Sequence, residues 1–341
     1  MEKPKRFLIV RTDRIGDVVL TLPLADVIKK FYPNAYIAML VRQYTSELSI
    51  NYKSIDETII YDNNGRKIGF LQLLKVIKSY NFDVAISVFP RFRLALILSL
   101  AKIPIRIGTA YRFYSFLFNI KIKEHRKFAQ KHELEYNLNL LKPLGIEPPS
   151  IKPPWLIPNS EHINSILTKL NKLGINRKQK LVVVHPGTGG STRSWSITNF
   201  ALLCKKLSDI DDIQILLTGT QKENYIIKKL LNEIGNTSIP FLYDLTLMEY
   251  AALVQHSKVF VGNSTGPLHI AAAVGTPVVG LYPQIPVLSA KRWGPYTDKC
   301  KILSPKNKPD DCKKCKKLEK CECMDSISVD EVFEAVKFFL N

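Results

Sequence analysis

The same local pattern occurs twice in the sequence: an apolar segment, a glycine-containing loop and then a helical stretch. The first copy runs through RFLIV, RTDRIGD and VVLTLPLADVIKKFYP at residues 6–33, and the second begins with LVVVHPGTGGSTRSW at residues 181–195. After each copy, short β-branched segments alternate with helical stretches, which is typical of βαβ units in parallel sheets. The sequence therefore predicts an α/β protein with two doubly wound halves.

A proline-rich segment separates these halves. A chain of 341 residues is too long for one ordinary core, and LGIEPPSIKPPWLIPNSEH at residues 144–162 has the composition of a linker. We therefore expect an N-terminal domain at 1–155 and a C-terminal domain at 156–341, with a last helix that could pack back on the first domain. Ligands are expected at the carboxyl ends of the strands, where such sheets bind them.

The apolar segments are too short to act as membrane spans or as a signal peptide. The first apolar run ends after five residues, and LALILSLA at 94–101 fits a buried helix better than a span, which needs roughly 20 residues. We therefore expect a cytoplasmic protein.

Positive charge is concentrated in the first half. The chain has a formal net charge of +19, and residues 1–150 hold 24 Lys and Arg against 13 Asp and Glu. The surplus fits a solvated basic face, an anionic membrane surface, an anionic acceptor or nucleic acid. Nucleic acid is not expected, because the aromatic residues that interleave the basic ones form no recognisable nucleic-acid-binding motif. These aromatics are Tyr111, Phe113, Tyr114, Phe116 and Phe118.

Two loops of the second half suit an anion. In VFVGNSTGPLHIAAAVGTPVVGLYP at 259–283, a strand passes through a turn into a helix that Ser264 or Thr265 can cap, and a helix start attracts anions. Taken alone, the pattern at 259–283 also fits an ordinary capped helix with no ligand. HPGTGGSTRSW at 185–195 adds three glycines and Arg193, although it matches neither the Walker loop nor the dinucleotide fingerprint. Two such loops together indicate a diphosphate, and so a nucleotide.

Two carboxylates follow the first strand. Asp13 lies in the loop, and Asp17 falls in the first turn of the helix that follows. Asp17 is either a favourable charge at a helix N-terminus or an ionised base that faces the ligand cleft.

Four segments, in this order and spacing, resemble glycosyltransferase family 9, the ADP-heptose:lipopolysaccharide heptosyltransferases. KHELEYNLNLLKPLGI at 131–146 extends the resemblance, which covers almost the whole chain. The four segments are RTDRIGDVVLTLPLADVIKKFYPNAYIAMLV at 11–41, VVVHPGTGGSTRSWSITNFALLCKKL at 182–207, GTQKENYIIKKL at 219–230 and VFVGNSTGPLHIAAAVGTPVVGLYP at 259–283.

The resemblance implies a GT-B fold, in which two Rossmann-like domains face a cleft, with the acceptor on the first domain and the nucleotide sugar on the second. It implies a metal-independent inverting transfer without a cofactor, with Asp17 as the base. Glu223 matches the residue that binds the nucleoside ribose, and Arg193 matches a donor-binding Lys of the family. The other matching donor residues are Gly187, Thr188, Gly189, Ser264, Thr265, Gly266 and His269.

One position departs from the family pattern. Many members have Asp-Thr-Gly where this chain has Ser264, Thr265 and Gly266. The loss of a carboxylate near the donor leaves a different nucleotide sugar as an alternative to ADP-heptose. Arg193 in place of Lys keeps the charge but changes its geometry.

The acceptor is expected to be an anionic glycolipid or oligosaccharide of the lipopolysaccharide core or a related surface glycan. Asp13, Arg66, Lys67, Arg91 and Arg93 are candidates to hold it, and peripheral contact with the inner face of the cytoplasmic membrane fits the basic surplus. A non-catalytic protein that binds nucleic acid or an anionic membrane is the alternative from another class.

Five of the six cysteines crowd the segment 300–323. Cys312, Cys315, Cys321 and Cys323 could hold a structural zinc ion, but the second pair is spaced more tightly than zinc ligands usually are. Reduced thiols are the more favoured expectation in a cytoplasm. Cys204 is expected in the core.

Overall fold

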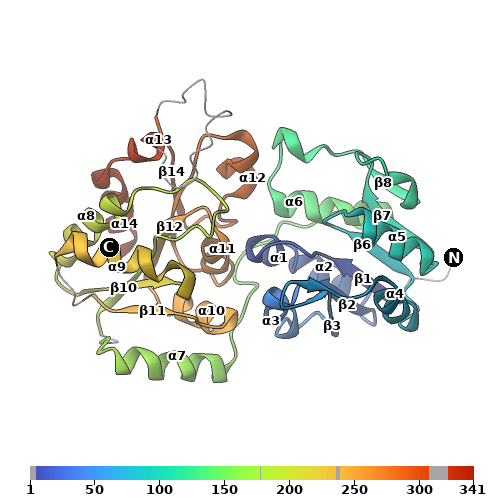
Figure 1. Cartoon of the computed structure of the whole chain (residues 1–341), viewed down its shortest axis with the longest axis horizontal. Coiled ribbons are helices and arrows are strands. Elements are labelled where there is room, and N and C mark those ends of the chain that lie inside the picture. The colour runs from blue at the N-terminus through green and yellow to red at the C-terminus, as the bar shows by residue number, and fades with distance from the viewer. Residues whose placement is uncertain (1–4, 177, 236–238, 307–321) are drawn as a thin grey trace. The chain divides into compact units, whose positions relative to one another are not determined.

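The computed structural model describes residues 5–176, 178–235, 239–306 and 322–341. The chain divides into two compact units, Met1–Ile151 and Lys152–Asn341. The division falls four residues before the domain boundary expected at 155 and 156. Each unit is built on a six-stranded parallel sheet (Figure 1).

In the first unit, the strands lie in the order β3-β2-β1-β6-β7-β8. Apart from a small antiparallel pair, β4 and β5, this is the 3-2-1-4-5-6 order of a Rossmann fold. The strands are β1 (Arg6–Val10), β2 (Tyr36–Val41), β3 (Glu57–Ile60), β4 (Asp62–Asn63), β5 (Arg66–Lys67), β6 (Val84–Ser87), β7 (Ile105–Thr109) and β8 (Ile120–Ile122).

Val10, the last residue of β1, lies opposite Leu40 on one side and Ser87 on the other. The central strands therefore end at one edge of the sheet, and the loop after β1 begins there. Phe7, Leu8, Ile9 and Val10 are fully buried, because helices cover both faces of a parallel sheet and its strands read as continuous apolar runs.

The helices of the first unit include the expected buried segment at 94–101, which lies in α5 and contributes Leu94, Ile97 and Leu98 to the core. Among the described residues, no helix has the length and hydropathy to cross a bilayer. The helices are α1 (Ile15–Val19), α2 (Pro23–Phe31), α3 (Ser46–Ile50), α4 (Phe70–Ser79), α5 (Phe92–Leu100) and α6 (Glu133–Leu138), with 3-10 turns η1 (Gln43–Thr45), η2 (Ser115–Leu117), η3 (Arg126–Phe128) and η4 (Asn139–Leu144).

The second unit repeats the same strand order, β11-β10-β9-β12-β13-β14. Its strands are β9 (Lys180–His185), β10 (Ile213–Gly219), β11 (Phe241–Tyr243), β12 (Val259–Asn263), β13 (Val278–Leu281) and β14 (Cys300–Leu303). Its helices are α7 (Ser160–Lys172), α8 (Ile197–Ser208), α9 (Asn224–Ile234), α10 (Leu247–Gln255), α11 (Gly266–Ala273), α12 (Ala290–Trp293), α13 (Glu322–Asp325) and α14 (Val329–Leu340), with 3-10 turns η5 (Gln221–Glu223) and η6 (Pro286–Leu288).

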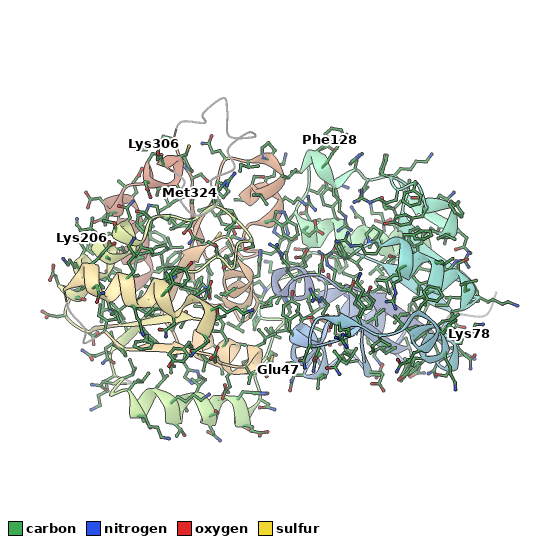
Figure 2. All side chains as sticks on the ribbon, in the orientation of Figure 1. Glu47, Lys78, Phe128, Lys206, Lys306 and Met324 are labelled. Carbon is green, nitrogen blue, oxygen red and sulfur yellow. The ribbon has the colours of Figure 1, made fainter. Side chains whose placement is uncertain are left out.

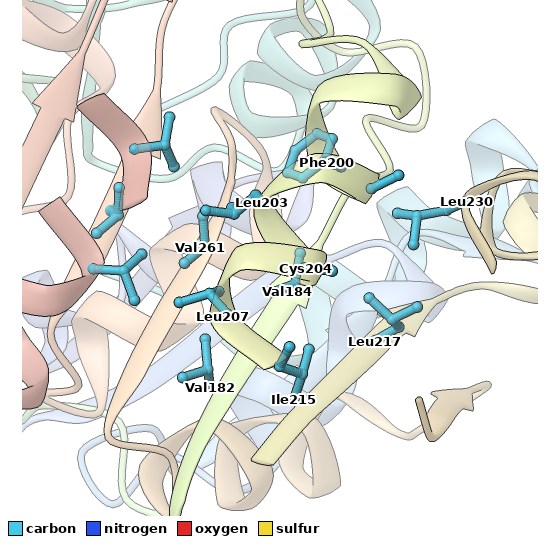
Figure 3. Packing of buried hydrophobic residues seen from close by; sticks show 14 of the residues in the cluster. Val182, Val184, Phe200, Leu203, Cys204, Leu207, Ile215, Leu217, Leu230 and Val261 are labelled. Atoms are coloured by element: carbon cyan, nitrogen blue, oxygen red, sulfur yellow. The ribbon is translucent and has the colours of Figure 1, made fainter. Parts of the chain in front are cut away.

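Helix α8 forms the centre of one core cluster of this unit (Figure 3). The Ser196 side chain caps the helix by accepting a hydrogen bond from the Asn199 N–H. Its apolar face presents Phe200, Leu203 and Leu207 to the strands, and burying each such side chain contributes about 1.5–3 kcal/mol. The last helix, α14, packs on α8 and on β12, β13 and β14 of the same unit.

Candidate active site

A buried arginine organises the loop that follows β1. Arg11 is only 2% exposed, and its Nε donates to Asp13 Oδ1 over 2.7 Å, while Nη2 donates to Asp17 and Nη1 lies 3.2 Å from Glu133 Oε1. Burial alone would lower the pKa of Arg11, but the charges of Asp13, Asp17 and Glu133 outweigh that effect and raise it. The guanidinium is therefore a permanent cation that fixes both aspartates.

The two aspartates form a carboxyl pair on this cation. Burial, opposed by Arg11 and reinforced by the neighbouring Asp17, raises the pKa of Asp13 to about 8. Asp13 therefore ionises less readily than a free carboxyl, and it hydrogen-bonds to the Asp17 side chain. Asp17 lies in the first turn of α1, and its side chain is 16% exposed. One carboxyl of the pair is thus held in place and still reachable by a substrate hydroxyl.

Helix α6 supports this pair from a distant part of the chain. Asn137 Nδ2 donates to the Leu20 carbonyl over 3.0 Å and to Thr21 Oγ1 over 3.2 Å, and Thr21 Oγ1 in turn donates to the Asp17 carbonyl over 2.7 Å. Glu133 also accepts a hydrogen bond from Arg126. The turn between α1 and α2 is therefore tied to α6 by side chains that are buried or nearly so.

In the second unit, the loop after β9 has the backbone that its glycines predict. Gly189 and Gly190 have φ angles of 51° and 69°, which L side chains rarely adopt. Gly187 is needed for a different reason, because a Cβ there would lie 2.2 Å from Glu223 Oε1. The loop is thus folded directly onto the Glu223 carboxylate.

Glu223 is held by the groups around it. It accepts hydrogen bonds from the Gly189 N–H over 3.1 Å and from the N–H and hydroxyl of Thr220 over 3.0 and 2.9 Å. Burial would raise the pKa of Glu223, but the interaction with His185 and these hydrogen bonds lower it below its usual value. Glu223 is therefore an ionised acceptor that fixes the position of Gly189.

Asn263, at the end of β12, joins the two anion-receptive loops. Its Oδ1 accepts from the Trp195 N–H over 3.1 Å, and its Nδ2 donates to the Pro186 carbonyl over 2.9 Å. Asn263 is fully buried. A single amide thus holds both ends of the 186–195 loop against the strand that leads into α11.

The start of α11 differs from the expected capped helix. Thr265 is the N-cap residue but forms no side-chain cap to the described residues of the helix, since its hydroxyl donates to the Asn263 carbonyl over 3.3 Å. Ser264 instead hydrogen-bonds to Tyr282. The expectation that one of these hydroxyls caps α11 is therefore wrong. The N-terminus of the helix at Gly266 can still attract an anion.

The other predicted donor residues lie in the same unit. Arg193 is 6% exposed and His269 is 4% exposed, and the His269 ring stacks edge-on against Trp293 at 6.4 Å between centroids. Gly187, Thr188, Gly189 and Glu223 meet in one cluster, and Ser264, Thr265 and Gly266 form the start of α11.

Comparison with known proteins identifies this arrangement. The family model described as glycosyltransferase family 9 (heptosyltransferase) matches residues 70–322.

The chain belongs to glycosyltransferase family 9.

Individual relatives agree with this family. A putative glycosyltransferase of Haemophilus influenzae is 29% identical over 304 residues, covering 86% of this chain and 87% of its own. Lipopolysaccharide heptosyltransferase 3 of Escherichia coli is 26% identical and covers 78% of this chain and 80% of its own. The structure of E. coli ADP-heptose lps heptosyltransferase II superposes with a TM-score of 0.79 at 20% identity, over 98% of each chain.

These findings confirm the expected family, the GT-B fold of two Rossmann-like parts and the glycosyltransferase class. The roles of the individual residues remain predictions. Sequence reasoning missed Arg11, Glu133, Asn137 and Asn263 as members of the site. Arg11 carried one signal, since it directly follows a buried strand, but its partner Glu133 lies 122 residues away.

The four predicted acceptor cations of this family 9 protein lie outside the Arg11 cluster. Arg66 and Lys67 form β5, exposed and paired with β4. Arg93 donates to the Ile68 carbonyl and lies over the Tyr61 ring, so its guanidinium is engaged by neighbouring residues of the first unit. Arg91 is exposed and lies over the Phe89 ring. Of the five predicted acceptor residues, Asp13 is the one that the structure brings to Asp17.

His185 is a buried residue at the end of β9. Its Nδ1 lies 3.0 Å from Thr218 Oγ1, which in turn lies 3.3 Å from the Tyr250 hydroxyl. Burial, only partly opposed by Glu223, lowers the pKa of His185. The ring is therefore held inside the second unit by Thr218.

The cysteines give one clear result. Cys204 is buried in α8 as expected, and burial raises the pKa of its thiol to about 12. Cys300 is a thiol whose Sγ donates to the Thr297 carbonyl over 3.2 Å. Among the described residues, no cluster could hold a metal ion. Cys312, Cys315 and Cys321 lie outside the described residues, so the zinc hypothesis is untested.

Proposed function

We propose that this protein transfers a heptose from ADP-heptose to a lipopolysaccharide-core or related surface-glycan acceptor, with inversion at the anomeric carbon. The names of the relatives support the donor and the acceptor, since one is called a lipopolysaccharide heptosyltransferase and another an ADP-heptose lps heptosyltransferase. The observation that carries the proposal is the Arg11 cluster, which fixes a partly exposed Asp17 in a buried frame.

On the acceptor side, Asp17 is the general base. Its carboxylate takes the proton of an acceptor hydroxyl, whose oxygen forms the new bond to the anomeric carbon while the bond to the diphosphate breaks. Arg11 holds the carboxylate in one orientation. The raised pKa of Asp13 disfavours a second negative charge beside Asp17.

On the donor side, the diphosphate leaves toward fixed positive groups. Gly187, Thr188 and Gly189 bring the loop backbone close, and Arg193 supplies a charge that makes strong bonds to phosphate. The start of α11 at Gly266, which follows Ser264 and Thr265, adds its backbone N–H groups, and His269 lies in its first turn. The Ser264 N–H itself donates to the Leu281 carbonyl over 3.1 Å. Glu223 binds the nucleoside ribose. These groups replace a metal ion in our proposal, so transfer should continue in EDTA.

We propose an anionic acceptor, which fits the basic first unit, and a site of action in the cytoplasm at the inner face of the membrane. Nucleic acid is not a partner in this proposal. A second candidate is the same transfer from a different nucleotide sugar, because Ser264 bonds to Tyr282 where many family members have a carboxylate.

Calorimetric titration with ADP, UDP, GDP and their sugar conjugates tests the donor. We expect selective binding of ADP and ADP-heptose, weakened at least tenfold by Arg193→Ala but not by Lys205→Ala, an exposed cation of α8. A preference for another nucleotide would replace the donor and keep the transferase. If no nucleotide binds, the proposal fails in favour of a non-catalytic protein that binds an anionic surface.

A further inference from the structure

An exposed group of aromatic side chains lies on the first unit, mainly in the segment between β7 and α6. Phe113 is 81% exposed, Phe116 69% and Phe128 60%, and Tyr111 and Phe92 are close to half exposed. Figure 2 labels Phe128 within this segment. We call these five rings, with the lysines and arginines beside them, the aromatic-basic face.

The segment is folded, so the exposure of these rings is not the result of a loose loop. Tyr114 and Phe118 are buried, and the Tyr114 hydroxyl donates to the Pro90 carbonyl over 2.8 Å. The Phe118 ring packs so tightly on Gly108 that a Cβ there would lie 2.6 Å from it. These two buried rings anchor the chain, while Phe113, just before Tyr114, and Phe116, between the two anchors, are left in solvent.

The exposed rings contact one another. The centroids of Phe92 and Phe113 are 5.7 Å apart. In a second group, the His125 ring centroid lies 4.4 Å from that of Tyr111 and 5.2 Å from that of Phe128. The face therefore carries two clusters of exposed rings, and exposed apolar patches of this kind often mark a binding surface.

The charge around these rings is almost entirely positive. Residues 89–131 contain ten lysines and arginines and a single acid, Glu124. That acid is taken up by Lys131, whose Nζ lies 2.5 Å from Oε1, and by the Asn139 amide. Arg112, Lys121, Lys123 and Lys127 are exposed, so the exposed rings lie in a segment with an excess of positive charge.

Aromatic rings beside cations fit the interface of an anionic bilayer. Exposed Phe side chains can bury at the boundary between headgroups and acyl chains, a Tyr ring favours the headgroup level, and each lysine or arginine near an anionic leaflet adds about 1 kcal/mol of attraction. Several moderate signals of this kind together give stable but reversible attachment. We propose that the aromatic-basic face docks this protein on an anionic lipid leaflet.

The face continues into the candidate site through one short turn. In η3, the Arg126 guanidinium bonds to Glu133, which itself bonds to Arg11. The next two residues, Lys127 and Phe128, are exposed and stacked, with Nζ 4.9 Å from the ring centroid. A lipid-anchored acceptor in the same leaflet would therefore arrive beside the Asp17 carboxylate. This step rests on the proposed function, whereas docking itself does not.

Vesicle co-sedimentation tests the docking directly. The full chain is mixed with vesicles of phosphatidylcholine alone or of phosphatidylcholine with phosphatidylglycerol, at moderate salt. We expect at least about tenfold stronger binding to the anionic vesicles. Phe113→Ser with Phe116→Ser, and separately Lys121→Glu with Lys123→Glu, should each reduce that binding about tenfold or more. These side chains are exposed, so the variants should keep the melting temperature of the parent.

The chain offers matched controls in the second unit. Tyr225→Ser and Phe338→Ser remove rings that are 63% and 60% exposed, and they should leave vesicle binding unchanged. Equal loss in the control variants, or no loss in the Phe113 and Phe116 double variant, would overturn the proposal. Binding to duplex DNA or RNA in place of vesicles would also overturn it and assign the face to nucleic acid.

A transfer assay separates this proposal from the proposed function. The Phe113 and Phe116 double variant should keep its kcat/KM on a soluble, delipidated acceptor and lose at least about tenfold on the same acceptor anchored in anionic vesicles. If no acceptor is glycosylated but vesicle binding follows the pattern above, the proposed function fails and the docking face stands. Equal activity of parent and variant on both acceptors would remove the link between docking and transfer.

Discussion

The contact between Gly187 and Glu223 gives the sharpest prediction of the donor site. A Cβ at position 187 would lie 2.2 Å from Oε1 and 2.5 Å from Cδ of Glu223, whereas real Cβ contacts are essentially never shorter than 3.0 Å. In Gly187→Ala, the carboxylate must therefore retreat by roughly an ångström. That movement breaks or stretches its hydrogen bonds to the Gly189 N–H and to Thr220.

The size of the effect follows from those bonds. A hydrogen bond to a charged group contributes about 1.5–3 kcal/mol to stability. Because water can replace part of the lost bonds, we expect the free energy of unfolding to fall by about 2–4 kcal/mol. On the proposed function, the displaced loop holds the diphosphate, and ADP affinity should fall about ten- to hundredfold. Titration calorimetry with ADP measures the affinity, and a thermal melt shows whether the fold survives.

Two comparisons make this test specific. Gly219→Ala places its Cβ in ordinary contact, 3.6 Å from Ile227 and 3.7 Å from the Glu223 Cβ, so it should bind ADP like the parent. In a Glu223→Ala background, Gly187→Ala should add little, because the clashing group is gone. A full effect of Gly187→Ala in that background would refute the reasoning.

Three further outcomes follow from the same structure. Arg11→Met leaves the carboxyl groups around it without their cation, so denaturant unfolding should show a loss of about 3–5 kcal/mol; an unchanged midpoint would contradict the cluster. Because Asp13 has its pKa raised to about 8, the folded state binds the extra proton between about pH 4 and 8 and loses stability as the pH rises through that window. The melting temperature of Asp13→Asn should therefore rise relative to that of the parent between pH 5 and pH 9. A difference in melting temperature that does not change with pH would contradict the raised pKa. Since burial raises the pKa of Cys204 to about 12, maleimide should label it only after unfolding, as peptide mass spectrometry will show; rapid labelling of the native protein would contradict its burial.

The fold was predictable because its signals are local. β1 and β9 are continuous apolar runs, each followed by a loop with glycine, and these features occupy neighbouring residues. The repeat of the pattern was enough to predict two parallel sheets. The left-handed φ angles of Gly189 and Gly190 likewise follow from the residue type.

The site was only partly predictable, because its contacts are long-range. Asp17 and Glu223 were predicted from their motifs, and their roles stay predictions. Nothing local indicates that Arg11 meets Glu133 or that Asn263 bonds to Trp195, 68 residues away. The capping expectation for α11 failed for a related reason. A hydroxyl at a helix start has several possible partners. In this fold Ser264 hydrogen-bonds to Tyr282, and the Thr265 hydroxyl donates to the Asn263 carbonyl.

The central claim is that Asp17 is the base of a glycosyl transfer, and Asp17→Asn tests it most directly. Donor affinity and turnover are measured on the same preparation, with Asp211→Asn, an exposed carboxylate of the second unit, as the control. We predict that Asp17→Asn lowers kcat by about 10²–10⁴-fold, while ADP binds within about twofold of the parent affinity and the control keeps both values. An unchanged kcat in Asp17→Asn would contradict the account.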